Sequence, residues 1–365
     1  MKTANNVLEK LPVARQKVET LAILRQLSAS TAALGELKGA ANILPNQEIL
    51  INAIVLQEAK DSSEIENIIT TRDELYKALA TTNNQSASIK EVINYRRTIF
   101  QGYELIKKQS FLRLNDLTCL QKTILENDAG IRSTPGTVLK NDKTGEVVYT
   151  PPQHKDEILE LLTNFLEHFN LSQTNLPKGH TALPVLINLA ILHYQFESIH
   201  PFYDGNGRTG RILNILYLIL NNQINVPILY LSSFIIENKA EYYRLLNTVN
   251  KTNEWEEWIL YMLKAVEQTS IKTIDKINSI KALLDKTIAK TQKEASKIYK
   301  KELVELLFEE PYSKIEYVTK KLGVERKAAS KYLKKMEEIG ILRSEKIGRE
   351  TIYINQELIN VLQIR

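Results

Sequence analysis

Two apolar runs flank one short polar segment, and this arrangement limits the folds that the chain can adopt. Residues 182–196 and 212–220 are apolar over lengths that suit buried helices. The segment between them, residues 200–211, contains glycines, two arginines, an aspartate and a histidine. The sequence therefore predicts two buried helices joined by a polar loop, with the loop at the start of the second helix.

The polar loop has the chemistry of a phosphate site. Backbone N–H groups at a helix start are unpaired and lie at the positive end of the helix dipole, so they bind anions. Gly205 and Gly207, on either side of Asn206, let a ligand approach the main chain and permit the positive φ values of an anion nest. Arg208 and Arg211 are three residues apart, so they share a helix face and could clamp two successive phosphates.

Two more side chains of the loop add a base and a metal ligand. Asp204 directly precedes the glycines, where a divalent cation that bridges phosphate oxygens would need an oxygen ligand. His200 is the only group in the segment whose unperturbed pKa suits proton abstraction near neutral pH. A hydroxyl group that accepts a phosphoryl unit would be its natural partner.

Other interpretations of the same residues need comparison. The run Gly205-x-Gly207-x-x-Gly210 matches the dinucleotide-binding fingerprint, which requires a preceding strand and an acidic residue about 20 positions later. Here the preceding run is helical, and the residues near Leu231 are apolar or carry hydroxyls. A purely structural glycine turn would leave the charged side chains without a role.

A transition-metal site is a further alternative. His193, Glu197 and His200 have a spacing that could place three metal ligands on one helix face. In the simpler interpretation, His193 packs in the core and Glu197 pairs with a nearby basic group.

The segment closely resembles the signature of the Fic family, His-x-Phe-x-(Asp/Glu)-Gly-Asn-Gly-Arg-x-x-Arg, and every specified position matches. The resemblance implies a mainly α-helical Fic-fold core with a small β-hairpin flap. It also implies a protein adenylyltransferase, which transfers AMP from ATP to a Ser, Thr or Tyr hydroxyl of a target protein, or of itself, and releases pyrophosphate. The phosphate-transferring branch of the family lacks the second arginine, so Arg211 favours nucleotidyl transfer.

The resemblance assigns roles by position. His200 would be the general base that deprotonates the target side chain, Asp204 would hold Mg²⁺ against the α- and β-phosphates, and Phe202 would anchor the loop in the core. The residues that would contact ATP are Gly205, Asn206, Gly207, Arg208, Thr209, Gly210 and Arg211. Tyr242, Tyr243 and Asn250 fall where related proteins contact the adenosine, with helix packing as the alternative.

Residues 130–152 resemble the flap hairpin of the family. The polar turn at residues 140–145, between β-branched runs, indicates a hairpin by itself. An exposed hairpin edge can align a peptide by strand addition, and Val148 and Tyr149 would position the target residue there. An ordinary structural hairpin is the alternative.

A regulatory motif lies upstream. Ser62-x-x-x-Glu66-Asn67 fits the pattern (Ser/Thr)-x-x-x-Glu-(Gly/Asn) of the Fic class that has an N-terminal inhibitory helix. The resemblance implies that Glu66 pairs with Arg211 and blocks the seat of the γ-phosphate. A carboxylate can replace a phosphate on a guanidinium. The alternative is a helix-capping box made by Ser63 and Glu66.

The C-terminal part has a different composition. Lysine becomes dense from Lys272 onward, and three short helices at 301–309, 315–322 and 324–339 precede two strands within 341–354. This order resembles a winged helix-turn-helix. Its third helix carries basic residues that suit DNA phosphates but offer little base readout, namely Arg326, Lys327, Lys331, Lys334 and Lys335. A solvated lysine face on a protein-docking or dimerising module is the alternative.

These observations predict four parts: a helical N-terminal region at 1–88, a catalytic core at 89–270, a helical linker at 271–298 and a winged-helix (α+β) domain at 299–365. A single cysteine, Cys119, excludes an internal disulfide framework. The first residues have no apolar signal core, and no apolar run is long enough to span a bilayer, so we expect a cytoplasmic protein.

Three points stay open. The same site would serve the reverse reaction, in which Glu66 activates water to remove AMP from a modified protein. A DNA-binding regulator that senses nucleotide is another possibility, although a sensor would not need the base His200. A homodimer is expected only from the family.

Overall fold

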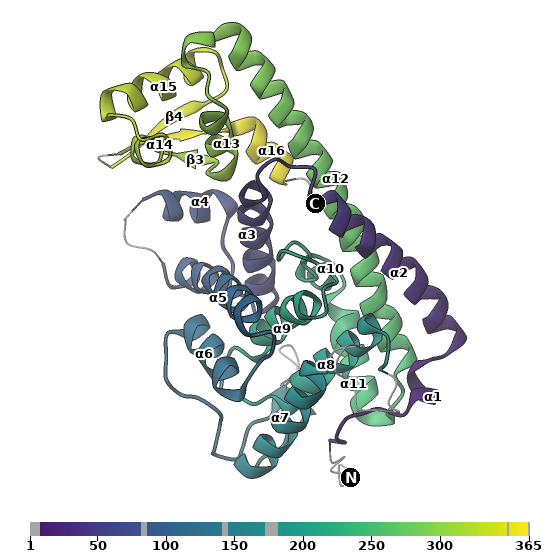
Figure 1. The fold of residues 1–365 in the computed structure, drawn as a ribbon. Coiled ribbons are helices and arrows are strands. Elements are labelled where there is room, and N and C mark those ends of the chain that lie inside the picture. Colours follow the sequence, from purple (N-terminus) through teal and green to yellow (C-terminus); the bar gives the residue numbers. More distant parts are fainter. Residues whose placement is uncertain (1–7, 82–85, 141–144, 172–181, 349, 364–365) are drawn as a thin grey trace.

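The computed structural model describes residues 8–81, 86–140, 145–171, 182–348 and 350–363. It is mainly helical with two small antiparallel sheets (Figure 1). None of the helices in these ranges is both long and apolar enough to cross a membrane. The elements in chain order are α1 (Arg15–Val18), α2 (Leu21–Ala40), α3 (Gln47–Ile65), α4 (Arg72–Ala80), α5 (Ala87–Gln109), α6 (Leu114–Leu125), β1 (Leu139–Lys140), β2 (Val147–Tyr149), α7 (Lys155–Asn170), α8 (Val185–Ile199), α9 (Asn206–Leu220), α10 (Ser232–Glu237), α11 (Lys239–Thr252), α12 (Glu256–Glu294), a short 3-10 turn (Ser296–Ile298), α13 (Lys301–Glu309), β3 (Tyr312–Ser313), α14 (Ile315–Leu322), α15 (Arg326–Glu338), β4 (Arg343–Ile347), β5 (Glu350–Ile354) and α16 (Gln356–Gln363).

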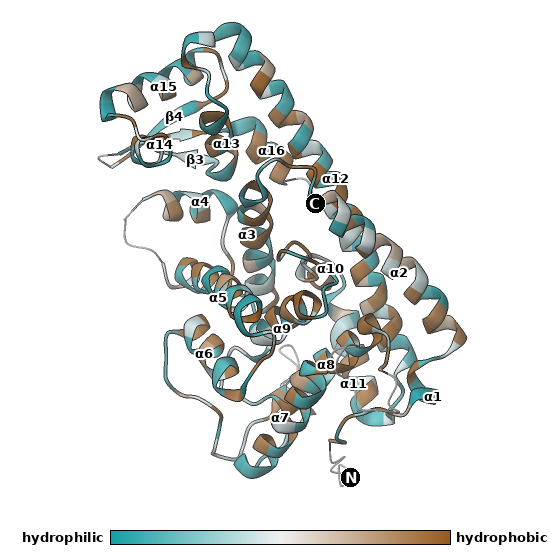
Figure 2. Cartoon of the chain, in the orientation of Figure 1, coloured by the Kyte–Doolittle hydropathy of each residue, from teal (hydrophilic) through white to brown (hydrophobic). Residues whose placement is uncertain are grey.

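The centre of the fold is the pair α8 and α9. Both helices are buried over most of their surface, because α5, α6, α7 and α12 pack around them. Figure 2 shows apolar segments, in brown, along both helices. A hydrogen bond also joins α12 to α8, because the indole N–H of Trp258 donates to the Ala190 carbonyl at 2.9 Å. The two buried helices predicted from the apolar runs are confirmed, and the loop between them lies at their junction.

The N-terminal helices are part of the same body as the core. α2 lies along α12 (Figure 1), and the Ser30 hydroxyl of α2 donates to the Leu263 carbonyl at 2.9 Å. α3 packs against α5 and α10. The division expected at residue 270 falls inside α12, which is one continuous helix of 39 residues. Core and linker are therefore joined without a break.

The hairpin expected between residues 130 and 152 is present as β1 and β2. The strands are antiparallel, with Leu139 opposite Tyr149 and Lys140 opposite Val147. The turn at 141–144 lies outside the described residues.

The C-terminal module has the element order of a winged helix. Gly323, with φ of +62°, ends α14 in the left-handed conformation that glycine readily adopts. α15 starts two residues later than expected, and β4 and β5 form the expected hairpin. The two-residue strand β3, which completes a sheet of order β3-β5-β4, and helix α16 were not predicted.

This module docks on α3 and α4 rather than standing apart. The Tyr312 ring of β3 stacks on Tyr76 of α4 with centroids 5.2 Å apart, and its hydroxyl donates to Asp73 at 2.5 Å. Lys77 of α4 pairs with Glu345 of β4 at 2.7 Å. The N-terminal helices thus contact both the core and the C-terminal module.

Candidate functional site

The loop between α8 and α9 is held by its own side chains. His200 ends α8 and Gly205 begins α9, and both adopt positive φ, at 47° and 77°. The Asn206 side chain closes the loop, because its amide donates to the Phe202 carbonyl at 2.8 Å and its oxygen accepts the Phe202 N–H at 2.9 Å. Phe202 itself is fully buried, as expected for an anchor. Asn206 therefore has a clear structural role in addition to any ligand contact.

Arg132 binds the start of the loop through hydrogen bonds to backbone carbonyls, and no pattern in the sequence indicated this role. Its fully buried guanidinium donates to the carbonyls of His200 at 2.6 Å and Ile199 at 3.2 Å, and also to the carbonyl of Pro152. One cation thus satisfies carbonyls from the end of α8 and from the segment after β2. The position of His200 depends on this arginine.

We expect Arg132→Met to lower the free energy of unfolding by about 2–4 kcal/mol, because buried carbonyls would lose a charged donor. Urea denaturation would measure this difference. Arg113→Met is the control, because Arg113 is exposed. Equal stability of the two variants would show that the Arg132 bonds do not hold the loop.

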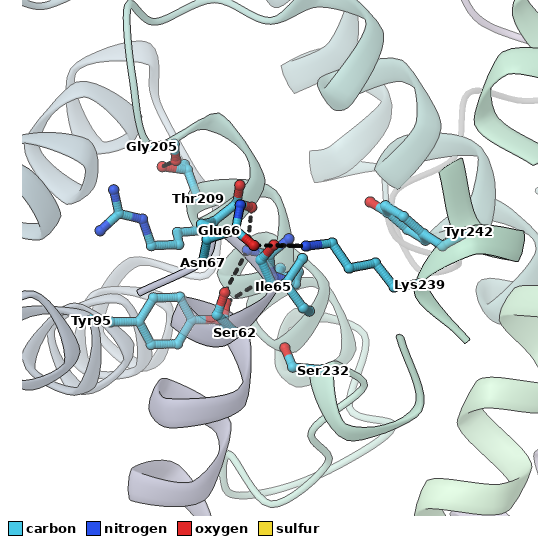
Figure 3. A network of polar contacts seen from close by, with 12 residues as sticks. Ser62, Ile65, Glu66, Asn67, Tyr95, Gly205, Thr209, Ser232, Lys239 and Tyr242 are labelled. Carbon is cyan, nitrogen blue, oxygen red and sulfur yellow. Dashed lines mark hydrogen bonds and ion pairs between the residues drawn. The ribbon is translucent and has the colours of Figure 1, made fainter. Parts of the chain in front are cut away.

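Arg211 meets the end of α3, where Ser62 and Glu66 are labelled in Figure 3. Its side chain is only 2% exposed. It donates through Nε to the Ser62 hydroxyl at 2.7 Å, through Nη2 to the Ser62 carbonyl at 2.9 Å, and through Nη2 to Glu66 Oε1 at 2.7 Å. The pairing of Glu66 with Arg211 that the motif implied is present, and Ser62 takes part in it through two oxygen atoms.

The Glu66 carboxylate also lies against the main chain of α9. A methyl group at position 207 would clash with Glu66 Oε1 and would lie 3.0 Å from Arg211 Nη1. Only glycine at position 207 lets the Glu66 carboxylate come this close to the first turn of α9. Free N–H groups and the helix dipole favour a negative charge there, so the carboxylate occupies an anion site.

The end of α3 explains the last position of the motif. Asn67 follows Glu66 with φ of +64°, and the Ile68 N–H bonds back to the Ser63 carbonyl at 3.0 Å. Glycine and asparagine are the residues that tolerate this left-handed turn best. Lys239 of α11 fixes the same turn by donating to the Ile65 carbonyl at 2.6 Å. The capping-box interpretation of Ser63 and Glu66 is wrong, because a helix ends here instead of beginning.

Arg208 and Asp204 lie on the other side of the glycine turn. Arg208 is 2% exposed and donates to Glu91 of α5 at 2.6 Å, a partner that the sequence did not indicate. Asp204 is 73% exposed; its Oδ1 accepts the Gly205 N–H at 2.6 Å and lies 3.7 Å from Arg208. An exposed carboxylate beside an anion site suits a divalent cation that also binds phosphate oxygens. The residues present therefore fit Mg²⁺.

Two family models match this part of the chain. The model described as Fic/DOC family N-terminal matches residues 24–104, and the model described as Fic/DOC family matches residues 111–218, so together they span more than half of the chain. The chain belongs to the Fic/DOC family. A third model, described as the C-terminal domain of protein adenylyltransferase SoFic-like, matches residues 283–358 of this Fic protein.

Similar proteins agree with this assignment. A probable protein adenylyltransferase of Aquifex aeolicus is 28% identical over 183 residues, which cover 49% of this chain and 52% of the relative. A protein adenylyltransferase of Caenorhabditis briggsae is 30% identical over 151 residues, covering 40% of this chain and 26% of the relative. The matched region thus spans about half of the first relative and about a quarter of the second.

Solved structures share the fold. A Fic family protein from Desulfovibrio desulfuricans G20 has a TM-score of 0.56 at 20% identity, covering 92% of this chain and 96% of that chain. A Fic domain containing signaling protein from Bacteroides thetaiotaomicron has a TM-score of 0.52 at 21% identity, covering 70% of this chain and 95% of that chain. The architecture is the Fic fold with an additional C-terminal domain.

The charges of the Fic loop are strongly coupled. Burial opposes ionisation of Glu66, but the charge and the hydrogen bond of Arg211 prevail and hold the pKa of Glu66 below its ordinary value of 4.5. In turn, burial opposes ionisation of Arg211, but nearby groups, the Glu66 carboxylate foremost, keep the pKa of Arg211 above its ordinary value. Both groups are ionised at neutral pH. The pair stabilises the fold above the ordinary carboxylate pKa, and this contribution is lost as the pH falls through the lowered pKa.

His200 has the properties of a neutral base. Burial and the nearby Arg132 charge lower the pKa of His200 to about 4. Its Nδ1 has no hydrogen-bond partner among the described residues. The imidazole is therefore unprotonated at neutral pH and can accept a proton.

The aromatic residues expected near adenosine lie in two environments. Tyr242 is only 1% exposed, and its hydroxyl lies 2.8 Å from His193 Nε2 (Figure 3 labels Tyr242). Tyr243 is 45% exposed, and Asn250 accepts a hydrogen bond from the Tyr194 hydroxyl at 2.7 Å. Tyr242 thus packs in the core, in agreement with the helix-packing alternative, while Tyr243 presents a ring to solvent.

The two competing interpretations of the motif do not hold. His193 is buried between Tyr242 and Asn214, and burial lowers its pKa to about 3. The described part of the chain contains no cluster of three or more His, Cys, Asp or Glu that could hold a metal ion. The dinucleotide fingerprint is also excluded, because α8 rather than a strand precedes the glycines. Glu197 does not pair as expected, since its Oε1 has no hydrogen-bond partner in the described residues.

The remaining predicted residues are at the surface. Val148 of β2 is 37% exposed, and the Tyr149 hydroxyl donates to the Ser198 carbonyl at 3.0 Å, which ties the hairpin to the end of α8. On α15 the basic residues Arg326, Lys327, Lys331 and Lys334 are exposed, and none of them forms an ion pair with another described residue.

Proposed function

We propose that this Fic protein is a protein adenylyltransferase that transfers AMP from ATP to a Ser, Thr or Tyr hydroxyl of a target protein or of itself. The observation that carries the proposal is the Glu66 carboxylate against Gly207 and Arg211, because it identifies an anion site beside a neutral histidine. The names of the Aquifex and Caenorhabditis relatives support the same activity.

The proposed chemistry follows from these groups. His200 accepts the proton of the target hydroxyl, whose oxygen then attacks the α-phosphorus of ATP, and the bond to pyrophosphate breaks. The N–H groups at the start of α9 and the Arg208 and Arg211 guanidiniums balance the phosphate charge. Asp204 would hold Mg²⁺, which supplies further positive charge at the phosphates. Val148 and Tyr149 of the exposed hairpin would align the target segment.

In the proposed scheme Glu66 is an inhibitor. Its carboxylate takes the place of the outer phosphate on Arg211, so ATP must displace it or bind in another arrangement. Because the pKa of Glu66 is lowered, a change of pH near neutrality does not release it. Release requires movement of α3.

Incubation of the protein with Mg²⁺, cell lysate and ATP labelled either at the α- or at the γ-phosphate tests the proposal. Relative to lysate alone, AMP transfer predicts additional labelled protein bands with the α-label and no additional bands with the γ-label. Bands with the γ-label alone would indicate phosphate transfer and would contradict the proposal.

The acid side of the pH profile should reflect the lowered pKa of His200. We expect the labelling rate of an active variant to stay level from pH 8 to pH 6 and to fall only nearer pH 4, because the base stays neutral over that range. Initial rates in overlapping buffers would measure this. A half-maximal rate near pH 6.5 would mean that the environment of His200 does not shift its proton affinity during turnover.

The reverse reaction, removal of AMP by water, is a weaker candidate. It would need Glu66 as a base, and a carboxylate held ionised by Arg211 is a poor one. Release of AMP from a purified labelled protein, with loss of that release in Glu66→Gln, would favour it.

A second function is supported by the unpaired basic face of α15. We infer that this face contacts nucleic-acid phosphates. The double variant Lys331→Glu and Lys334→Glu should weaken binding of random-sequence duplex DNA about tenfold or more and reduce the salt dependence. Fluorescence anisotropy at several salt concentrations measures both, with Lys108→Glu on α5 as control. Unchanged affinity would leave α15 as a solvated or protein-docking face, and binding of DNA without any protein labelling would favour a nucleotide-sensing regulator.

A further inference from the structure

A second polar cavity lies where α3, α10, α12 and α16 meet. It has a volume of about 130 Å³ and is separate from the loop that follows α8. The charged and polar side chains that line it include Asp61, Arg72, Tyr230, Glu237, Lys272 and Lys276. Asp61 directly precedes Ser62, the residue that binds Arg211 through two oxygens. The cavity is therefore adjacent to the inhibitory contact.

Asp61 is a buried carboxylate with an unused oxygen. The residue is 3% exposed, and Oδ2 accepts a hydrogen bond from Gln57 at 2.6 Å. Oδ1 has no hydrogen-bond partner among the described residues, and Lys60 Nζ lies 3.7 Å away. Burial raises the pKa of Asp61 above its ordinary value. Asp61 thus brings a negative charge to the wall of the cavity, and a positively charged ligand group beside it would be favoured.

Two cations, Arg72 and Lys276, also line the cavity. Arg72 Nη1 and Lys276 Nζ both donate to the Leu362 carbonyl of α16, at 2.8 and 3.4 Å, and Lys276 also donates to the Tyr230 hydroxyl at 3.2 Å. Neither cation has a carboxylate oxygen within 4.0 Å in the described ranges. Burial and the charge of Arg72 lower the pKa of Lys276 to about 8. The third cation, Lys272, differs because it is paired with Glu237 at 3.1 Å.

We propose that this cavity binds a small zwitterion of the size and charge pattern of an α-amino acid. The carboxylate of the ligand would pair with Lys276 and Arg72, and its ammonium group would pair with the Asp61 carboxylate. The volume fits the class, since an engineered cavity of about 150 Å³ holds benzene.

Such a ligand would strengthen the inhibited state. It would join Asp61 of α3 to Arg72 before α4 and to Lys276 of α12, and so would hold the helix that carries Glu66 in its inhibitory position. A ligand that binds one arrangement better than another shifts the population toward it. This regulatory consequence rests on the proposed adenylyltransferase activity, whereas the binding site itself does not.

Binding is tested first without ATP. Isothermal calorimetry of the full chain with glycine, L-alanine, L-serine, L-aspartate and L-glutamate at millimolar concentrations should give saturable heat for at least one. The N-acetyl derivative and the amide of that amino acid each lack one charge and should bind at least tenfold more weakly. No heat with any of the five, or equal binding of the N-acetyl derivative, the amide or inorganic phosphate, overturns the proposal.

Variants locate the site. Asp61→Asn and Lys276→Met should each weaken binding at least tenfold, and Val361→Trp should abolish it by filling the cavity while it keeps the charges. Lys286→Met on α12 is the control, because Lys286 pairs with Glu357 outside the cavity. Unchanged binding in folded Val361→Trp protein would place the ligand elsewhere.

Activity is then a separate measurement. The bound amino acid should lower AMP labelling by wild-type protein at least threefold and should leave the Glu66→Gly variant unaffected. Heat of binding with no protein labelling under any condition would refute the proposed activity while the site stands. Labelling that the ligand does not change would refute the regulatory link alone.

Discussion

Replacement of Glu66 by glycine should increase AMP labelling about 5- to 150-fold, which corresponds to the one to three kcal/mol that is typical of coupling between sites. The reason is the position of its carboxylate, which binds Arg211 and lies against Gly207 where a phosphate would bind. The variant removes this charge and frees the guanidinium. Initial rates of incorporation from α-labelled ATP at saturating Mg²⁺ would measure the change.

Two further variants separate charge from helix stability. Glu64→Gly changes the same last turn of α3 but removes only the pair with Lys60 at 2.5 Å, so labelling should change little. Glu66→Gln keeps the shape and loses the charge, so it should give an intermediate rate. Equal rates for wild type, Glu64→Gly and Glu66→Gly would exclude inhibition by this contact.

Loss of the imidazole of His200 should reduce labelling about 100- to 10,000-fold, the usual contribution of general acid–base catalysis. The activated Glu66→Gly variant is the appropriate background, since its rate leaves room for a large decrease. His200→Asn is preferable to His200→Ala, because asparagine tolerates the positive φ of 47° at this position. The control His154→Ala removes an exposed histidine next to α7.

If His200 is the base, its replacement should slow the transfer of AMP and leave the binding of ATP unchanged. ATP should still stabilise the His200→Asn protein against thermal unfolding, because the anion site of α9 does not use the imidazole. If His200→Asn in the Glu66→Gly protein labels targets as fast as Glu66→Gly alone, the role of His200 as base is disproved.

The local parts of the site could be predicted from sequence, because they depend on neighbours along the chain. The glycine turn, the start of α9 and the basic pair Arg208 and Arg211 all lie within one short segment. The partner of Arg211 was predicted only through the family motif around Glu66. The two residues are 145 positions apart, and no spacing rule joins them.

The residues that hold the site from outside the loop could not be predicted, because their partners are far away in the sequence. Arg132, Glu91 and Lys239 are single charged residues in unremarkable surroundings, and each acquires its role only when distant helices meet. The exposed fraction of Tyr242 is another example, because Tyr242 and Tyr243 are adjacent but face core and solvent respectively. Helical spacing alone does not determine which of two neighbours faces inward.

The docking of the winged helix was also beyond sequence analysis. A lysine-rich region suggested a separate unit, but the stack of Tyr76 on Tyr312 and the short strand β3 fasten it to α4. These contacts are made by residues that no pattern distinguishes from surface tyrosines.

The unbroken length of α12 has a consequence for how this protein can evolve. Each residue inserted into a helix advances the residues after it by about 1.5 Å and rotates them by about 100°. A single insertion between the segment against α2 and the segment against α16 would turn Tyr312 and Glu345 away from Asp73 and Lys77. Homologues that keep this docking should therefore show substitutions in α12 but conserve its number of residues.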